Sequence, residues 1–220
     1  MLTALSLGKD GLLPYLEVVF TMWKREFLVL SLALLCLGLC SFGSCGSASA
    51  ESKTEISPDT KVLIAYFSWS GNTRAAAEKI RDFTGGTLFE IQAKEPYPAT
   101  YQECLNRAKS ECADGVRPEL ATTVADLAQY DLVFIGSPTW YGVLAPPVLT
   151  FLSNPALNGK KIVLFCTHGG GGSDSCFLQA ERVCRSTGAE PPVCVAFPGS
   201  QVRHSDQVER WLERDFELQK

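Results

Sequence analysis

The chain has 220 residues, a formal net charge of −4 and 46% hydrophobic residues. This length and composition suit one α/β domain behind a processed N-terminus better than two full domains. The acidic balance, without a basic stripe to follow phosphates, argues against a nucleic-acid partner.

The first element, residues 1–50, has the order of an export leader. A basic pair at 24–25 precedes an apolar stretch at 27–39, and small residues close the segment at Ala50. This order is typical of a secretory signal peptide, and about 13 apolar residues fall short of the roughly 20 that a spanning helix needs. Three outcomes stay open: cleavage after Ala50, a lipoprotein leader lipidated at Cys45, or a retained anchor helix. Each predicts an extracytoplasmic protein that is secreted or held at a membrane only through its N-terminus.

The next segment, residues 51–60, is polar, contains Pro58 and lacks periodicity, which predicts a flexible linker. A folded domain is predicted over residues 61–220. It opens with 61–67, a short apolar run rich in β-formers. Such a run is typical of a parallel strand that is buried on both faces.

Helices and strands alternate after this first strand. The predicted helices include 73–83, 101–111 and 206–218, and the further predicted strands are 87–92, 131–136, 161–166 and 193–197. Five strands with helical crossovers favour an open, doubly wound parallel sheet in three α/β/α layers. Ligands of such sheets bind beyond the carboxyl ends of the strands. The turns after 61–67, 131–136 and 161–166 are therefore the candidate binding loops.

The first of these loops is Ser68-Trp69-Ser70-Gly71-Asn72-Thr73. Hydroxyl and amide side chains surround a glycine where a helix would begin, and the unpaired N–H groups of a helix start can bind phosphate. The chain lacks a nucleotide-triphosphate loop, and no G-x-G-x-x-G turn follows the strand. An alternative is that Ser70 or Asn72 only caps the helix.

The sequence of this turn and of two later segments resembles the flavodoxin family. The turn in residues 66–73 is similar to that family's phosphate loop, in which two hydroxyl residues flank one position and are followed by glycine, any residue and threonine. The likeness continues in the GSPTWYG segment at 136–142 and the FCTHGG segment at 165–170. It is strongest with a flavodoxin-like subfamily whose P-x-W-[WY]-G and C-T-H-G-G loops flank the flavin. The resemblance implies a flavodoxin-like fold of strand order 2-1-3-4-5 with non-covalently bound FMN.

The resemblance also implies which residues hold the FMN. They are Ser68, Trp69, Ser70, Gly71, Asn72, Thr73, Pro138, Thr139, Trp140, Tyr141, Gly142, Thr167, His168, Gly169 and Gly170. The first loop would bind the phosphate, the aromatic pair of the second loop would stack on the ring, and the glycines of the third would bring N–H groups to its pyrimidine edge. No catalytic side chain and no metal ligand is assigned.

Several side chains keep open roles. His168 is expected either beside the flavin or hydrogen-bonded to the loop backbone, and Arg74 to point outward rather than pair with the phosphate. Six cysteines follow the leader, at 104, 112, 166, 176, 184 and 194, and they could form disulfides or remain buried thiols. Two pairs, 104 with 112 and 176 with 184, are excluded if helical, because eight helical residues span about 12 Å and a disulfide tolerates about 7 Å.

The implied function is an exported FMN-binding electron-transfer protein whose partner is a redox protein or a small electron acceptor. An FMN-dependent NAD(P)H:quinone-type reductase is the alternative, because the glycine loop lacks an aromatic residue to cover the outer flavin face. The absence of a nicotinamide-binding motif favours the carrier. A flavin-free binding module on the same fold is the second alternative.

Overall fold

The computed structural model describes residues 53–219. The predicted leader, with its cleavage and lipidation sites, lies outside these residues. Within the described part, no helix combines the length and apolar character needed to cross a membrane.

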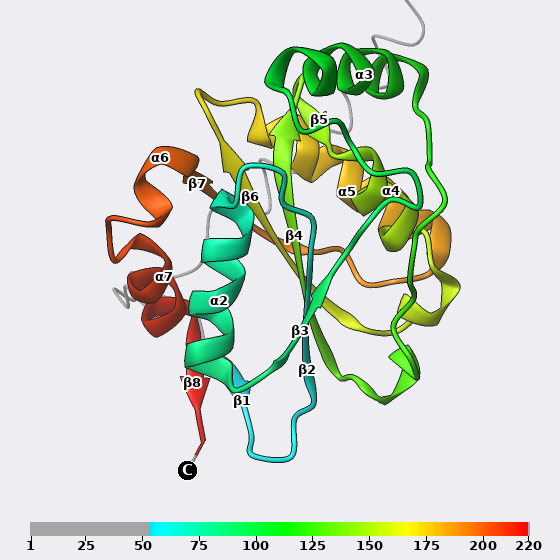
Figure 1. Ribbon diagram of the computed structural model, residues 1–220. Coiled ribbons are helices and arrows are strands. Elements are labelled where there is room, and N and C mark those ends of the chain that lie inside the picture. The colour runs from blue at the N-terminus through cyan, green and yellow to red at the C-terminus, as the bar shows by residue number, and fades with distance from the viewer. Residues whose placement is uncertain (1–52, 220) are drawn as a thin grey trace, which may run out of the picture. The chain divides into compact units, whose positions relative to one another are not determined.

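A parallel sheet forms the centre of the fold (Figure 1). Its strands are β2 (Val62–Tyr66), β3 (Thr87–Glu90), β4 (Leu132–Trp140), β6 (Lys161–His168) and β7 (Val193–Pro198). They lie in the order β3-β2-β4-β6-β7, all parallel. Counted along the five strands this is 2-1-3-4-5, so the predicted fold class and strand order are confirmed. The sheet also includes β5 (Val143–Leu144), which pairs antiparallel with the end of β4 and was not predicted.

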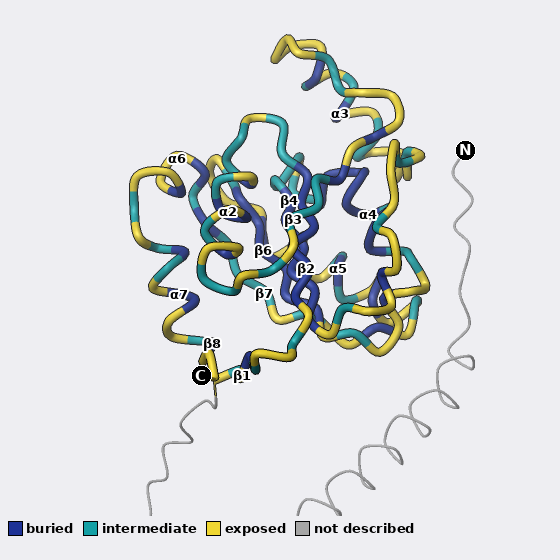
Figure 2. Tube along the Cα trace, turned by 60° about the horizontal axis from the view of Figure 1, so that its bottom comes forward, coloured by how far each residue is buried: buried dark blue, intermediate teal, exposed yellow. Residues whose placement is uncertain are grey.

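Helices cover both faces of the sheet (Figure 1). On one face lie α2 (Asn72–Thr84), α6 (Gly199–Val202) and α7 (Gln207–Asp215), and on the other α4 (Pro146–Leu152) and α5 (Ser173–Thr187). The remaining α-helix described, α3 (Tyr101–Asp114), lies at the end of the sheet and is largely exposed (Figure 2). Two short 3-10 helices, η2 (Leu127–Gln129) and η3 (Pro155–Leu157), complete the connections.

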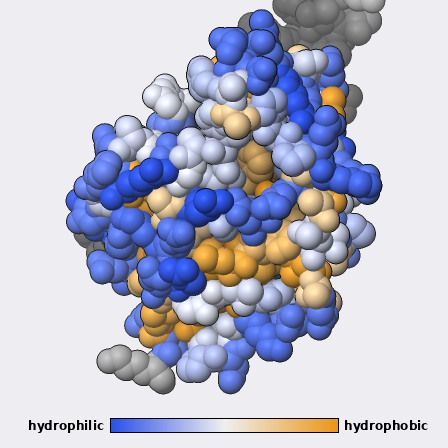
Figure 3. Space-filling view, viewed as in Figure 1, coloured by the Kyte–Doolittle hydropathy of each residue, from blue (hydrophilic) through white to orange (hydrophobic). Residues whose placement is uncertain are grey.

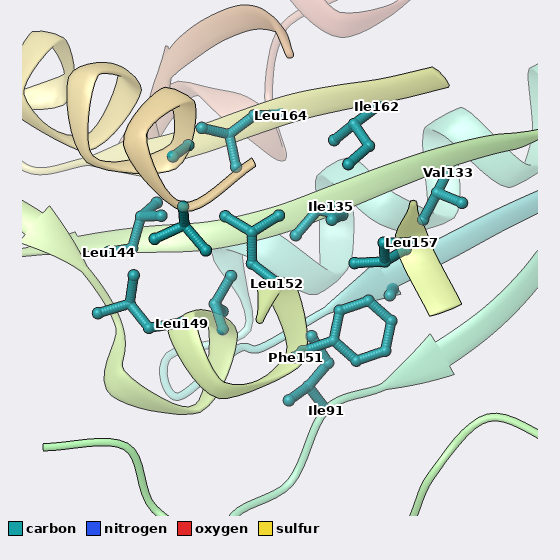
Figure 4. Close-up of a cluster of buried hydrophobic side chains, with 14 of the residues drawn as sticks. Ile91, Val133, Ile135, Leu144, Leu149, Phe151, Leu152, Leu157, Ile162 and Leu164 are labelled. Atoms are coloured by element: carbon teal, nitrogen blue, oxygen red, sulfur yellow. The ribbon is translucent and has the colours of Figure 1, made fainter. Parts of the chain in front are cut away.

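Alternate residues of each central strand enter two separate cores. In β2, Leu63 and Ala65 face the α4–α5 side, and Ile64 packs against α2 on the other side. Every residue of β2 is buried, and the central strands are the darkest part of Figure 2. The α4–α5 core is filled by branched aliphatic side chains around Phe151 (Figure 4). This burial on both faces explains why the strands read as continuous apolar runs.

Several boundaries of the predicted architecture are wrong. The predicted strands 131–136 and 161–166 continue to Trp140 in β4 and to His168 in β6, so five residues predicted in loops lie within strands: Pro138, Thr139, Trp140, Thr167 and His168. The predicted linker 51–60 contains β1 (Thr54–Ile56), and the predicted helix 206–218 ends at Asp215 and continues as β8 (Phe216–Leu218). These two strands pair in parallel as a separate small sheet. Ile56 and Phe216 are both buried in the core beneath α7. A three-residue strand is too short for a periodic pattern, so tertiary packing decides these segments.

Polar side chains cover most of the face in Figure 3, with an apolar area near its middle, where Figure 1 has β2 and β3 in front.

All six cysteines of residues 53–219 are free thiols. Cys104 and Cys112 lie on one helix, α3, and Cys176 and Cys184 lie on another, α5. This is the condition under which a disulfide within either pair was excluded.

Candidate functional site

The three predicted loops lie at the carboxyl ends of β2, β4 and β6, which are adjacent in the sheet. The loops touch one another directly. Thr73 Oγ1 of the first loop lies 2.9 Å from Thr167 Oγ1 of the third, and both residues are buried. A side-chain carbon at Gly172 would lie 3.3 Å from the Cα of Gly142 in the second loop. The strand order reverses between β2 and β4, which is where ligands of such sheets bind.

The first loop ends at the start of α2 without a side-chain cap. Gly71, with φ +86°, occupies the N-cap position, and no side chain bonds to the first turn there. The alternative in which Ser70 or Asn72 only caps the helix is therefore not seen. The Ser68 hydroxyl is buried and has no hydrogen-bond partner. Uncapped N–H groups and an unpaired buried hydroxyl fit a ligand rich in acceptor oxygens, such as a phosphate.

Arg74, next in the chain, is engaged elsewhere. Its guanidinium forms an ion pair with Glu90, and the side chain is about half exposed. The hydrogen bonds to Glu90 and Tyr66 raise the pKa of Arg74, so its charge stays with these partners. This agrees with the expectation that Arg74 points away from the phosphate loop.

The second loop is a tight hairpin turn. Trp140 pairs with Val143, and the two residues between them, Tyr141 and Gly142, have φ of +51° and +78°. Positive φ at both central positions is typical of a type I′ turn. An aromatic residue rarely adopts this conformation, and here the Tyr141 hydroxyl donates a hydrogen bond to the Leu105 carbonyl of α3, at 3.1 Å.

The two aromatic side chains of this loop differ in environment. The Trp140 ring packs edge-on against Phe67, with ring centres 5.3 Å apart, and against Tyr97, at 5.0 Å. It therefore belongs partly to the α4–α5 core. Tyr141 is 51% exposed. The exposed Tyr141 ring is the freer of the two to contact a planar ligand.

The third loop begins with His168 and four glycines. His168 Nδ1 accepts a hydrogen bond from the Gly171 N–H, at 3.0 Å, so the expected hydrogen bond to the loop backbone is present. Side-chain carbons at Gly169 and Gly170 would meet nothing within 4 Å. The hydroxyl of Ser173, where α5 begins, is buried without a partner. This loop therefore also has an unpaired buried hydroxyl, and open space lies beside the backbone of two of its glycines.

A cavity of about 310 Å³ joins the three loops to α3. Five of its lining residues were predicted: Trp69, Thr139, Trp140, Tyr141 and Gly169. Four more come from α3 and were missed: Tyr101, Cys104, Leu105 and Ala108. Of the other predicted residues, Ser68 and Gly71 line neighbouring cavities. Those not among the lining residues of these three cavities are Ser70, Asn72, Thr73, Pro138, Gly142, Thr167, His168 and Gly170. The volume is at the lower end of the range for small-molecule sites.

Polar contacts hold α3 over this cavity. Arg107, which pairs with Glu111 within α3, donates a hydrogen bond to the Pro96 carbonyl at 3.0 Å, and its guanidinium lies 4.4 Å from the centre of the Tyr97 ring. The Tyr97 hydroxyl donates to Glu111, and burial together with this carboxylate raises the pKa of Tyr97 far above its usual value. On the other side, Trp69 Nε1 donates to the Pro98 carbonyl, at 2.9 Å. The 95–98 segment thus links α3 to the first loop.

A second cavity, of about 320 Å³, lies beside the first, and Trp69 lines both. Its other walls include Ser68, Glu90 and Gln92. The Trp69 indole therefore separates an apolar cavity under α3 from a more polar cavity beside β3. The unpaired Ser68 hydroxyl is on the polar side.

Comparison with known proteins adds a family match. The family model described as flavodoxin matches residues 61–214. A flavoprotein of Lactobacillus acidophilus, solved in complex with FMN, is 29% identical with a TM-score of 0.56, over 65% of this chain and 96% of that one. A flavoprotein of Bacteroides eggerthii is 27% identical with a TM-score of 0.57, over 71% and 98%.

Curated relatives match over shorter segments. The NAD(P)H dehydrogenase (quinone) of Cupriavidus metallidurans is 31% identical over 111 residues, which are 46% of this chain and 53% of that protein. The protein of the same name in Paraburkholderia phymatum is 31% identical over 121 residues, 50% and 59%. This chain thus spans between half and three-fifths of the length of these relatives.

Proposed function

The chain belongs to the flavodoxin family, and from this premise we propose that it binds FMN non-covalently and works as an exported electron-transfer protein. One observation carries the proposal: loops from three adjacent strands and one helix line a single cavity. Beside it lies a turn with an uncapped helix start and an unpaired buried hydroxyl. A flavin mononucleotide has the matching parts, a planar apolar ring system and a phosphate.

The residues present fit these two parts. Ser68, Ser70, Asn72 and Thr73 would hold the phosphate together with the first N–H groups of α2. Tyr141 and Trp140 supply apolar surface for the ring and keep water away from it. The glycines after His168 permit close backbone approach. When bound, FMN supplies the one- and two-electron chemistry, and the protein binds, orients and shields it.

The visible spectrum and a flavin titration of the 51–220 segment test the proposal. We expect a yellow protein, or a colourless one that quenches FMN fluorescence with saturation. Ser68→Ala should weaken FMN binding about tenfold, because a hydrogen bond to a charged group is lost. Ser110→Ala, on the exposed side of α3, is the control. Colourless protein without any response to added FMN would leave a flavin-free module on the same fold.

A reductase is the second candidate. The two curated relatives are named NAD(P)H dehydrogenase (quinone), and the cavity under α3 offers space for a small acceptor. Rapid NAD(P)H oxidation by the FMN-loaded protein with a soluble quinone would support it. Two well-separated one-electron potentials without NAD(P)H turnover would support the carrier. The basic and apolar order of residues 1–50 supports export, which signal-peptide processing in cells tests directly.

A further inference from the structure

Arg203 lies directly against the first loop. It follows α6, and its Nη2 donates a hydrogen bond to the Ser70 carbonyl, at 2.8 Å. A side-chain carbon at Gly71 would overlap this Nη2 atom. The guanidinium therefore covers the Ser70–Gly71 peptide, and Gly71 is required both for its positive φ and for this contact.

The backbone that carries Arg203 is itself anchored on the loop. Figures 1 and 2 show α6 beside the N-terminal end of α2. A side-chain carbon at Gly199, the first residue of α6, would lie 2.8 Å from Asn72 Nδ2. Val202, just before Arg203, is buried in the same core as α2. The position of the Arg203 guanidinium thus depends on two contacts of the preceding backbone, that of Gly199 with Asn72 and that of Val202 with the core.

Within the part of the chain that the structure describes, Arg203 has no acidic partner, in contrast to two nearby cations. It lines a groove of about 430 Å³ together with two other cations, Arg74 and Lys79, and two carboxylates, Glu78 and Asp82. Arg74 pairs with Glu90, and Lys79 lies 2.7 Å from Glu209. Among residues 53–219, no ion pair joins Arg203 to a carboxylate. Its positive charge remains available to an anion in the loop.

We propose that Arg203 is a positioning and specificity residue that makes the first loop select a phosphorylated flavin over the unphosphorylated one. In a trans peptide the carbonyl and the N–H point in opposite directions. The hydrogen bond to the Ser70 carbonyl therefore fixes the Gly71 N–H on the opposite side of that peptide, away from the guanidinium. The unpaired charge adds attraction for a phosphate dianion. This inference rests on the proposed function.

The test compares FMN with riboflavin, which lacks the phosphate. Fluorescence quenching gives both dissociation constants for the full chain and for Arg203→Ala, Arg203→Lys and Arg210→Ala. Arg210, exposed and paired with Asp206 at 2.9 Å, is the matched control. We expect Arg203→Ala to weaken FMN binding about tenfold and riboflavin binding less than about twofold. Arg203→Lys should recover part of the loss and Arg210→Ala should change neither constant.

Other outcomes contradict the proposal. Equal losses for both flavins would make Arg203 a structural support of the loop, and unchanged FMN binding would remove its role altogether. Inorganic phosphate is the second probe and needs no flavin: it should raise the melting temperature of the wild type and not of Arg203→Ala. A wild type that responds to phosphate but to neither flavin would overturn the proposed function and leave the anion role of Arg203 in place. No response to phosphate or flavin would overturn both.

Discussion

Gly136 shows how a single hydrogen atom in place of a side chain determines the packing of the sheet. It lies in the middle of β4, between Tyr66 of β2 and Phe165 of β6. A side-chain carbon there would overlap the Phe165 ring and lie 2.9 Å from Tyr66 Cβ. We expect Gly136→Ala to lower the free energy of unfolding by about 1–3 kcal/mol, the usual cost of overpacking. Gly170→Ala, where the added carbon meets open space, should stay within about 0.5 kcal/mol in the same urea titration.

The buried hydroxyl pair of Thr73 and Thr167 links the first and third loops. Replacing either residue by valine leaves the other hydroxyl buried without a partner, which costs about 1–3 kcal/mol. Replacing both removes the unpaired group, so the double variant should lose less than the sum of the single losses, by about 1 kcal/mol or more. Chemical denaturation of the four proteins measures this coupling. Additive losses would mean that the 2.9 Å contact contributes nothing to stability.

At the scale of elements, the small sheet of β1 and β8 is the clearest departure from expectation. Ile56 and Phe216 are 4% and 3% exposed, and the Phe216 ring lies 5.4 Å from that of Trp211. A chain shortened to begin at Lys61 should therefore lose about 2–4 kcal/mol of stability relative to one that begins at Glu51, comparable to removing one large core side chain. Ile56→Ala in the longer chain should reproduce most of this loss. Equal melting temperatures would restore the interpretation of 51–60 as a mere linker.

The same contrast explains what could be predicted from sequence. The central strands β2, β4 and β6 could be found because they are buried on both faces and form apolar runs bounded by turn residues. The edge strands β3 and β7 are only partly buried and were found as shorter apolar runs between the predicted helices. β1 and β8 have three residues each, and their pairing joins segments about 160 residues apart. The candidate loops could be placed because they follow strands. The contribution of α3 could not, because the hydrogen bonds from Tyr141 to Leu105 and from Tyr97 to Glu111 join segments that no local pattern relates.

At the scale of the whole molecule, the free thiols couple stability to alkaline pH. Burial is the largest cause in each case: it raises the pKa of Cys112 and Cys184 to about 11 and that of Cys194 to about 12, from a usual value of 9.0. The folded state thus keeps these thiols protonated where the unfolded state ionises them. The contribution of each protonated thiol to the free energy of unfolding is therefore fully present below pH 9 and is lost as the pH rises toward 11–12. Each thiol lowers the free energy of unfolding by about 1.4 kcal/mol per pH unit in this window.

Cys184, fully buried between α5 and the sheet, isolates one such contribution. Cys184→Ala costs some packing at every pH, so the informative quantity is the change in unfolding free energy between pH 8 and pH 10.5, from urea titrations under reducing conditions. Lysines and tyrosines titrate in both proteins and cancel in the comparison, whereas Cys184 also raises the pKa of Cys194, so the difference reports these two thiols together. We expect the alkaline loss to be smaller in Cys184→Ala by about 1–2 kcal/mol, and unchanged in Ser186→Ala two residues away. The same alkaline loss in Cys184→Ala and wild type would mean that this thiol ionises as readily in the folded protein as in the unfolded chain.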